Sequence, residues 1–337
     1  MYIAQIIKEL NKTLASPYDM NQEGVLGMNN RNISFISRYN ERRLYPLVDN
    51  KLITKKLAKE HGIRTSALIG TLKNPRDISR FLEIIGDYKE FCIKPASGSG
   101  GKGIVVIKGK NEENGNFIKS SGMEITIKEL QKQLSNITAG LYSLGNRADI
   151  ALIEELIHVD DLFSDISYEG VPDVRVIVFK GFPIMCMTRL STAESDGKAN
   201  LHQGAVGVGL CLRTGRAIRA VQHNKPILNH PDTGINLLEI VMPKWDEILK
   251  LASICYEMSG LGYMGTDIVL DKDRGPMVLE LNVRPGLAIQ ICNNAGLLAR
   301  LRLVNEVSKR KKFTVDERIA FSKGHFGVFK KGFNDAP

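Results

Sequence analysis

Cysteine is scarce in this chain, and the few cysteines argue against a fold held by disulfides. The 337 residues include only five, at Cys92, Cys186, Cys211, Cys255 and Cys292. They are odd in number, far apart and mostly embedded in apolar sequence. This pattern favours reduced core thiols over a disulfide framework or a zinc site.

Long hydrophobic runs are also missing. The apolar runs are short and interrupted by charge, well below the roughly 20 residues needed to cross a bilayer. Residues 1–10 carry charge early and have no basic segment ahead of an apolar one, so they do not read as a secretory signal. We therefore expect a cytoplasmic protein with no membrane partner.

The charge is positive but dispersed. Lys and Arg exceed Asp and Glu by 46 to 37, which gives a formal net charge of +9. The one dense basic run covers residues 309–312, and a solvated helix end explains it better than a docking patch for an anionic substrate. A nucleic-acid partner is not expected from so scattered a distribution.

The order of predicted elements favours an α+β fold. We expect helices over 47–62 (ended by Gly62), from Asn74-Pro75 onward, over 127–144 and around 245–258. We expect strands over 65–72, within 91–108, at "IALIEELI", on either side of the "FKGFP" turn at Gly181, and at "MVLELNV". Residues 109–124 are polar and rich in Asn and Gly, which predicts a loop or an excursion of the chain.

The glycine-rich stretch "KPASGSGGKG" follows a predicted strand and precedes another. Its letters match G-x-G-x-x-G, but a dinucleotide fingerprint or a Walker A loop would open a helix. Here the β-branched residues 104–107 predict a strand instead. A strand, a glycine loop and a second strand favour a flap that closes over phosphates, with Lys94 on the incoming strand. A glycine-rich hairpin with a surface lysine is the alternative.

Two later strands carry oxygen donors. "YMGTDIVL" places Asp267 on one strand, and "MVLELNVRPG" places Glu280 and Asn282 on one face of the next. Carboxylates of this kind, together with phosphate oxygens, are typical Mg²⁺ ligands. The alternative is a pair of edge-strand acids that face water.

Taken in order, these motifs resemble the ATP-grasp superfamily of ATP-dependent carboxylate–amine ligases. The lysine strand and glycine flap are followed by "IEELI", "DVRV", "KANLHQGA" and finally "ELNVRPG". Phrases such as "YPLVDNKL", "ANLHQGAVGVG" and "HPDTG" resemble most closely the alpha-L-glutamate ligase-like, or sugar-transfer-associated, group, which is related to the ribosomal-protein glutamate ligases. The resemblance implies an ATP-grasp fold, in which two α+β lobes clasp ATP, here with a short or truncated N-terminal segment.

The resemblance also implies roles for particular residues. The nucleotide-binding residues would be Lys51, Lys94, Ser97, Gly98, Ser99, Gly100, Gly101, Lys102, Gly103, Glu154, Glu155, Leu156, Asp173 and Asn200, with Glu155 and Leu156 at the adenine hinge. The Mg²⁺ ligands would be Asp267, Glu280 and Asn282, and the catalytic residues Arg189, Lys198 and Arg284. Arg175 is either a further site residue or a structural partner of Asp173. His202 and His223 are candidates for proton handling, with a structural role preferred for each.

The implied reaction is amide formation through an acyl phosphate, with ATP and two Mg²⁺ ions, or Mn²⁺ in their place. Its substrates would be a small-molecule or peptide carboxylate and an amine, for example glutamate. The alternatives are a phosphotransferase acting on a hydroxyl, such as that of a sugar, and an ATP-binding regulatory protein with weak turnover. Only about 45 residues precede the helix of the first lysine. We therefore expect the substrate site to be built by the two lobes alone or completed by a protein acceptor or a second subunit.

The expected organisation has four parts. Residues 1–45 form a short N-terminal segment, 46–150 the lobe with the phosphate flap, 151–310 the lobe with the metal site, and 311–337 a C-terminal tail.

Overall fold

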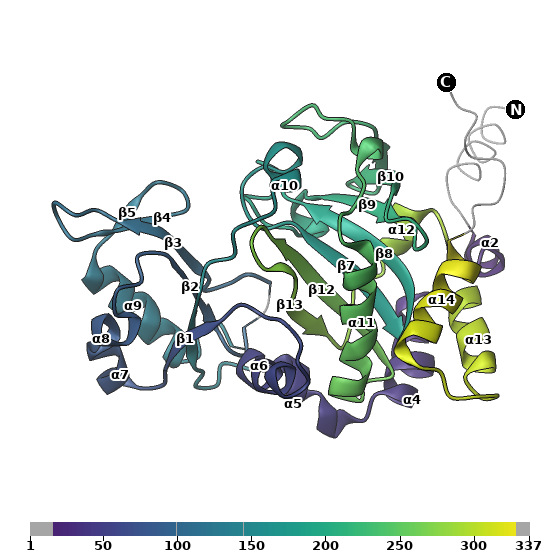
Figure 1. Ribbon diagram of the computed structural model, residues 1–337, viewed down its shortest axis with the longest axis horizontal. Helices are drawn as coiled ribbons and strands as arrows, with labels where there is room; N and C mark the ends of the chain where they lie inside the picture. Colours follow the sequence, from purple (N-terminus) through teal and green to yellow (C-terminus); the bar gives the residue numbers. More distant parts are fainter. Residues whose placement is uncertain (1–15, 99, 144, 328–337) are drawn as a thin grey trace, which may run out of the picture.

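Two antiparallel sheets with separate hydrophobic cores make up the computed structural model, which describes residues 16–98, 100–143 and 145–327 (Figure 1). No helix of this described part is long and apolar enough to cross a membrane. The α+β fold class is confirmed, because both sheets pack against helices.

The smaller sheet holds six strands in the order β1-β6-β2-β3-β4-β5. The strands are β1 (Leu68–Leu72), β2 (Phe91–Pro95), β3 (Val105–Lys110), β4 (Phe117–Lys119), β5 (Glu124–Ile125) and β6 (Ala151–Glu154). Its helices are α7 (Pro75–Ser79), α8 (Phe81–Ile85) and α9 (Ile127–Thr138). Phe81, Phe91 and Phe117 pack edge to face in its core, 5.5–6.2 Å apart.

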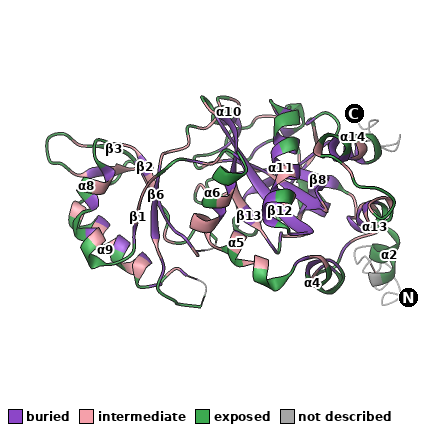
Figure 2. Cartoon of the chain, turned by 60° about the horizontal axis from the view of Figure 1, so that its bottom comes forward, coloured by how far each residue is buried: buried purple, intermediate pink, exposed green. Residues whose placement is uncertain are grey.

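The larger sheet holds seven strands in the order β11-β10-β9-β8-β7-β12-β13. The strands are β7 (Asp173–Phe179), β8 (Phe182–Leu190), β9 (Val206–Leu210), β10 (Ala217–Gln222), β11 (Lys225–Ile227), β12 (Tyr263–Asp271) and β13 (Gly275–Asn282). Figure 2 shows β8, β12 and β13 as mostly buried, because this sheet is covered by helices. It therefore forms the buried centre of the molecule.

The remaining helices surround the larger sheet. They are α2 (Pro17–Gln22), α3 (Met28–Asn30), η1 (Arg31–Ile36), α4 (Ser37–Tyr39), η2 (Arg42–Leu44), α5 (Pro46–Asp49), α6 (Lys51–Glu60), α10 (Leu162–Ile166), η3 (Leu201–Gln203), η4 (Leu237–Glu239), α11 (Trp245–Ser259), α12 (Ile289–Asn293), α13 (Leu298–Val307) and α14 (Val315–Phe326). In Figure 1, α11 crosses the sheet and α13 and α14 lie at its end.

Several predicted elements are confirmed. The Asn74 side chain accepts a hydrogen bond from the Asp77 amide and so caps α7 where the sequence placed a helix start. The turn between β7 and β8 has positive φ at both Lys180 (50°) and Gly181 (79°), as a two-residue hairpin of type I′ requires. The helix predicted around 245–258 is α11.

The single helix predicted over 47–62 is wrong, because the chain bends at Asn50. Asn50 has extended backbone, and its side chain accepts from the amides of Leu52 and Ile53, which starts a new helix, α6, at Lys51. Gly62 lies just beyond the end of α6 with φ of 65°, as predicted. The break matters because it brings Lys51 into the first turn of a helix.

Two other boundaries are also wrong, and one further segment contains strands that the sequence did not predict. The strand predicted over 65–72 begins only at Leu68, and the helix predicted to reach 144 ends at Thr138. Residues 109–124 are not a plain loop, since they include the end of β3 and the short strands β4 and β5. The side chains of Asn111, Asn114 and Asn116 donate to the Glu124 carboxylate. Because polar contacts rather than apolar packing hold these short strands, no hydrophobic periodicity in the sequence indicates them.

The helices ahead of the smaller sheet pack on the larger core. Phe35 lies against Phe179 (5.7 Å between ring centroids) and Tyr263 (6.1 Å). Val48 and Ala58, on α5 and α6, belong to the same core. The proposed division of the chain at residues 46, 151 and 311 stays a prediction.

Candidate nucleotide and metal site

Lys51 joins the helix α6 to the larger sheet and to the glycine loop. Its Nζ lies 3.5 Å from Oε1 of Glu280 and donates to the carbonyl of Gly98 at 2.7 Å. Its own amide donates to the Ala96 carbonyl at 2.9 Å. The first predicted lysine therefore lies between the flap and a predicted metal ligand.

Lys94 lies on β2 and points into the same region. Its Nζ is 2.7 Å from Oε2 of Glu154, on the neighbouring strand β6, and both side chains are less than a tenth exposed. Burial alone would lower the pKa of Lys94, but Glu154 outweighs it and raises the pKa. Lys94 is therefore a buried cation.

Lys55 is a member of this cluster that sequence reasoning missed. Its Nζ lies 3.2 Å from Oε1 of Glu154 and donates to the Ser66 carbonyl and, at 3.0 Å, to the Ser66 hydroxyl. Lys55 follows Lys51 by four residues, so both lie on one face of α6. The four-residue spacing from Lys51 is the feature of the sequence that could have indicated Lys55 as a member of the cluster.

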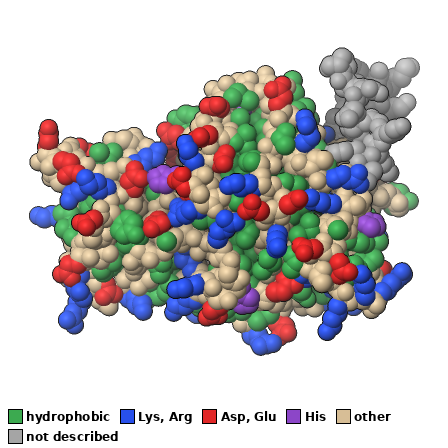
Figure 3. All heavy atoms as spheres, viewed as in Figure 1, with side chains coloured by type: hydrophobic (Ala, Val, Ile, Leu, Met, Phe, Trp, Pro, Cys, Tyr) green, Lys and Arg blue, Asp and Glu red, His purple; other side chains and the backbone are tan. Residues whose placement is uncertain are grey.

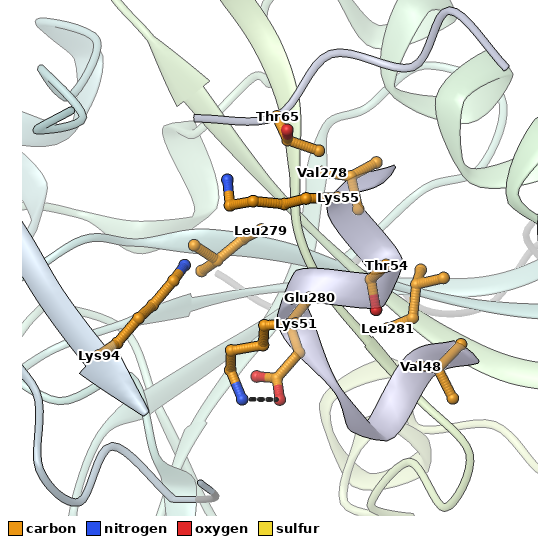
Figure 4. Close-up of a pocket in the computed structure, with 10 residues that line it drawn as sticks. All are labelled: Val48, Lys51, Thr54, Lys55, Thr65, Lys94, Val278, Leu279, Glu280 and Leu281. Carbon is orange, nitrogen blue, oxygen red and sulfur yellow. Dashed lines mark ion pairs between the residues drawn. The ribbon is translucent and has the colours of Figure 1, made fainter. Parts of the chain in front are cut away.

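A small cavity lies among these lysines (Figure 4). Lys51, Lys55 and Lys94 line it together with Glu280 and with Leu279, which lies between Lys55 and Lys94 in the view. The centre of a water molecule can occupy a volume of about 10 Å³ there, so the cavity has room for about one water molecule. The side chains thus leave little space among the three lysines.

The three predicted metal ligands come together on adjacent strands. Asp267 of β12 is the register partner of Glu280 of β13, so both side chains lie on one face. Asn282 lies two residues further along β13, and its amide donates to Oδ2 of Asp267 at 3.0 Å. The hairpin between β12 and β13 therefore positions all three.

Two arginines hold the Asp267 carboxylate. Arg175 donates to both of its oxygens (2.7 and 2.6 Å), and Arg189 donates to Oδ2 (2.9 Å). Burial would raise the pKa of Asp267, but the two guanidinium groups outweigh it and lower the pKa to about 2. Asp267 is therefore ionised at neutral pH.

Asp173 pairs with Arg189 rather than with Arg175. Nε of Arg189 donates to Oδ1 of Asp173 at 2.7 Å, and a second nitrogen donates to Oδ2. Of the two roles considered for Arg175, pairing with Asp173 is replaced by pairing with Asp267, which Arg175 faces across the β7–β12 pair. Asp173, expected near the nucleotide, is thus bound by an arginine of its neighbouring strand.

These donors fit a hard divalent cation. Mg²⁺ takes oxygen ligands and is usually bound through one or two carboxylates and phosphate oxygens. The Glu280 side chain keeps 35% of its surface exposed beside Asp267. Over the described ranges no three His, Cys, Asp or Glu side chains gather as a metal-binding group. The set here is different, with two carboxylates and one amide.

The predicted flap connects β2 and β3. Ser97 donates its amide to the Asp149 carboxylate (2.9 Å to Oδ2), which fixes the start of the loop. Gly100, Gly101 and Gly103 have φ of 65–75°, a region that favours glycine. Lys102 is exposed between them. Ser99 lies outside the described residues.

The predicted hinge residues contact the β12–β13 turn. Arg274 lies 2.8 Å from the Glu155 carboxylate and donates to the Leu156 carbonyl at 3.0 Å. Tyr88 donates its hydroxyl to Glu155 at 3.2 Å. These residues line an open cavity of about 510 Å³. The hinge therefore lies where the two sheets meet.

Asp267, Glu280 and Asn282 are called the acid cluster below. Three other predicted site residues lie outside it. Lys198 is exposed and pairs with Asp196 at 2.8 Å. Asn200 caps the short helix η3, where its side chain accepts from the His202 amide at 3.1 Å. Arg284 is exposed, with its guanidinium 5.6 Å from the centre of the Tyr45 ring.

The two histidines considered for proton handling are on the surface. His202 follows Asn200 in η3, and His223 lies 2.9 Å from the carboxylate of Glu194. Figure 3 shows Lys and Arg mixed with Asp and Glu over the visible face, without one large basic patch. On that face the distribution agrees with the dispersed charge of the sequence.

Comparison with known proteins gives a family match and distant structural likenesses. The family described as sugar-transfer associated ATP-grasp matches residues 30–306. No curated protein matches the chain. The ATP-grasp ligase PsnB complexed with minimal precursor is 17% identical over 81% of this chain and 63% of its own length, with a TM-score of 0.44.

Two further solved structures are similarly distant. D-cycloserine synthetase DcsG is 14% identical over 84% of this chain and 80% of its own, with a TM-score of 0.41. The D-alanine-D-alanine ligase from Coxiella burnetii is 14% identical over 83% and 60%, with a TM-score of 0.42. This chain thus spans less than two thirds of the length of PsnB and of the Coxiella ligase.

Proposed function

Because the chain belongs to the sugar-transfer associated ATP-grasp family, we propose that it binds ATP with Mg²⁺ between its two sheets and forms an amide through an acyl phosphate. The observation that carries the proposal is the meeting of Lys51 with Glu280. This pair brings a cation from the first turn of α6, beside the flap, to the acid cluster of β12 and β13.

The phosphates would lie among the lysines. Lys51 and Lys94 approach from α6 and β2, and Lys51 contacts the glycine loop at the Gly98 carbonyl. Cations and backbone amides stabilise the charge that spreads over a phosphoryl group in transfer. Glu155 and Leu156 would hold the adenine at the hinge.

The metal would lie on the acid cluster. Asp267, Glu280 and Asn282 would hold one or two Mg²⁺ ions, with Mn²⁺ as the alternative. Bound there, the ions would neutralise phosphate charge and orient the transferred group. Asp267 would exchange part of its contact with Arg175 and Arg189 for the metal, and these guanidiniums would then face the acyl phosphate.

The reaction has two steps. A carboxylate oxygen attacks the γ-phosphorus of ATP and ADP leaves, which forms the acyl phosphate. An amine nitrogen then attacks the carbonyl carbon, the carbon–oxygen bond to phosphate breaks, and the ammonium proton is lost. We propose a peptide or small-molecule carboxylate and an amine as substrates, with Arg189 and Arg284 as contacts of the substrate carboxylate or the acyl phosphate. Lys198 and Asn200 would lie near the γ-phosphate. The substrate site would be built by the two lobes alone or completed by a protein acceptor or a second subunit.

Binding of a non-hydrolysable ATP analogue tests the nucleotide and metal assignment. Calorimetry should show binding that requires Mg²⁺ in the native chain and is lost in Asp267→Asn/Glu280→Gln. The matched control is Asp161→Asn/Glu83→Gln, which changes two exposed acids. Mg²⁺-dependent binding that survives in the first double variant would contradict the metal assignment.

Release of ADP separates the ligase from a phosphotransferase. Pools of carboxylates and amines, incubated with ATP, should give an amide product and ADP release that increases when the amine is added. A phosphorylated hydroxyl product that needs no amine would instead support a kinase. ATP binding without turnover would support a regulatory protein.

A further inference from the structure

Glu154 has two lysines where one would neutralise it. Lys94 lies 2.7 Å from one oxygen and Lys55 3.2 Å from the other, and Ser66 donates to Oε2 at 2.6 Å. The side chains of Glu154, Lys94 and Lys55 are 2%, 9% and 11% exposed. A surplus buried cation is costly unless an anion joins it.

The two lysines reach Glu154 from different elements. Lys94 comes from β2 of the smaller sheet, whereas Lys55 comes from α6, which packs on the larger core through Ala58. Figure 4 shows both amino groups directed toward the space beside Leu279. Because that space holds about one water, a phosphate can enter only if side chains move.

Of the two lysines, Lys94 is the one that we expect to turn to a phosphate. It lies one residue before Pro95 and three before Ser97, at the start of the flap, and Glu154 is its ion-pair partner. Lys55 is held more firmly, since it also donates to the carbonyl and hydroxyl of Ser66. If Lys94 turned away in the absence of Lys55, Glu154 would be a buried carboxylate without a cation, which is strongly unfavourable.

We propose that Lys55 neutralises Glu154 when Lys94 turns to a bound phosphate, and is therefore a positioning residue for nucleotide binding. The inference rests on the proposed function, because it concerns the same nucleotide site between the two sheets. Lys55 acts through Glu154 and Lys94 and need not touch the nucleotide. Burial lowers the pKa of Lys55 to about 8, with Glu154 opposing, so the lysine is mostly charged at pH 7.

The test is a double-variant cycle read as affinity. We would measure the Kd of the Mg²⁺ complex of a non-hydrolysable ATP analogue, at pH 7, for the native chain, Lys55→Met, Glu154→Gln and Lys55→Met/Glu154→Gln. Lys55→Met should raise the Kd about tenfold or more, because Glu154 then retains Lys94. Relative to Glu154→Gln, the double variant should differ by less than about threefold, because a neutral amide needs no cation. Lys56→Met, at the next and exposed residue of α6, should leave the Kd unchanged.

Unfolding by urea, measured on the same proteins, separates positioning from stability. A Lys55→Met chain that loses stability but binds the analogue as the native chain does would overturn the inference. A Kd that Lys55→Met raises equally with and without Glu154→Gln would also overturn it. If the native chain itself binds no analogue, the proposed function fails, and this inference with it.

Discussion

Arg189 connects two buried carboxylates, and its guanidinium opposes the cost of burying their charge. It donates to Asp173 on the adjacent strand β7 and to Asp267 on β12. Burial raises the pKa of Asp173, with Arg189 opposing it. Substitution of Arg189 therefore measures how much these ion pairs contribute to the free energy of unfolding.

We predict that Arg189→Met lowers the free energy of unfolding by about 3–5 kcal/mol, because it leaves a buried carboxylate without its cation. Urea denaturation at pH 7 measures the change. Arg189→Met/Asp173→Asn should recover part of the loss. Arg64→Met, which breaks an exposed pair with Glu247, is the control and should cost at most about 1 kcal/mol. An equal loss in Arg189→Met and Arg64→Met would contradict the prediction.

His230 of "HPDTG" fixes the loop that carries Lys198. Its Nδ1 accepts from the amides of Asp232 and Thr233 (3.3 and 3.4 Å), and its Nε2 donates to the Ser191 carbonyl at 3.1 Å. The Asp232 carboxylate in turn accepts from the Ala193 amide at 2.9 Å. His230 is neutral in this arrangement, so it reads as a structural residue.

Acid should weaken the fold through His230. Burial lowers the pKa of His230 below its usual 6.5, with the Ser191 carbonyl partly opposing. Below pH 6.5 the unfolded chain binds a proton that the folded chain resists, so the free energy of unfolding falls as the pH falls toward the folded pKa. Urea midpoints at pH 7 and pH 5.5 should differ less in His230→Gln than in the native chain. An unchanged difference would exclude His230 as a source.

At the scale of elements, α12 packs closely on β9, the strand next to the one that carries Arg189. Gly207 is the register partner of Arg189, and Gly209 that of Met187. A Cβ on Gly209 would lie 2.3 Å from the backbone oxygen of Cys292 in α12. The "GAVGVG" pattern thus has a packing reason, because only glycine lets the helix approach so closely.

We predict that Gly209→Ala costs about 1–3 kcal/mol of unfolding free energy, because the added methyl group forces α12 away from β9. Gly109→Ala in β3 is the matched control. Its Cβ would meet only the end of Ile118, at an ordinary 3.9 Å. Thermal and urea unfolding of both variants measure the difference, and equal stability would show that α12 can move without cost.

At the scale of the whole molecule, the cleft is bridged by contacts from each sheet to the other. Arg274 of the β12–β13 turn contacts Glu155 and Leu156, which follow β6. Lys55 and Lys51 reach from α6 to Glu154 and Gly98. Nucleotide bound between the sheets should therefore stabilise both of them together.

We predict that the Mg²⁺ complex of a non-hydrolysable ATP analogue slows amide hydrogen exchange in both β2–β3 and β12–β13. At about 100 times Kd it should add about 2.7 kcal/mol to the free energy of unfolding. Exchange mass spectrometry with and without the analogue measures the protection. The strands β10 and β11, at the end of the larger sheet opposite β13, are an internal control. Protection confined to one sheet would contradict binding between the two.

The sequence by itself determined the fold class, the family resemblance and most motif positions. Periodicity gave the strands around Gly181 and the helix α11, because apolar spacing reflects burial on one face. Alternation along "MVLELNV" put Glu280 and Asn282 on one side of a strand. The resemblance to a sugar-transfer-associated ATP-grasp protein is confirmed by the family match over residues 30–306. The assignments of individual site residues stay predictions.

Only the tertiary structure decided which charges meet. Arg175 and Asp267 are 92 positions apart in the chain, and Lys55 and Glu154 come from different elements, so no local pattern contains those contacts. The break at Asn50 and the strands β4 and β5 were also missed, because side-chain hydrogen bonds rather than apolar periodicity define them. Pairing of buried charge depends on strand register and helix docking, and these are fixed when the whole chain packs.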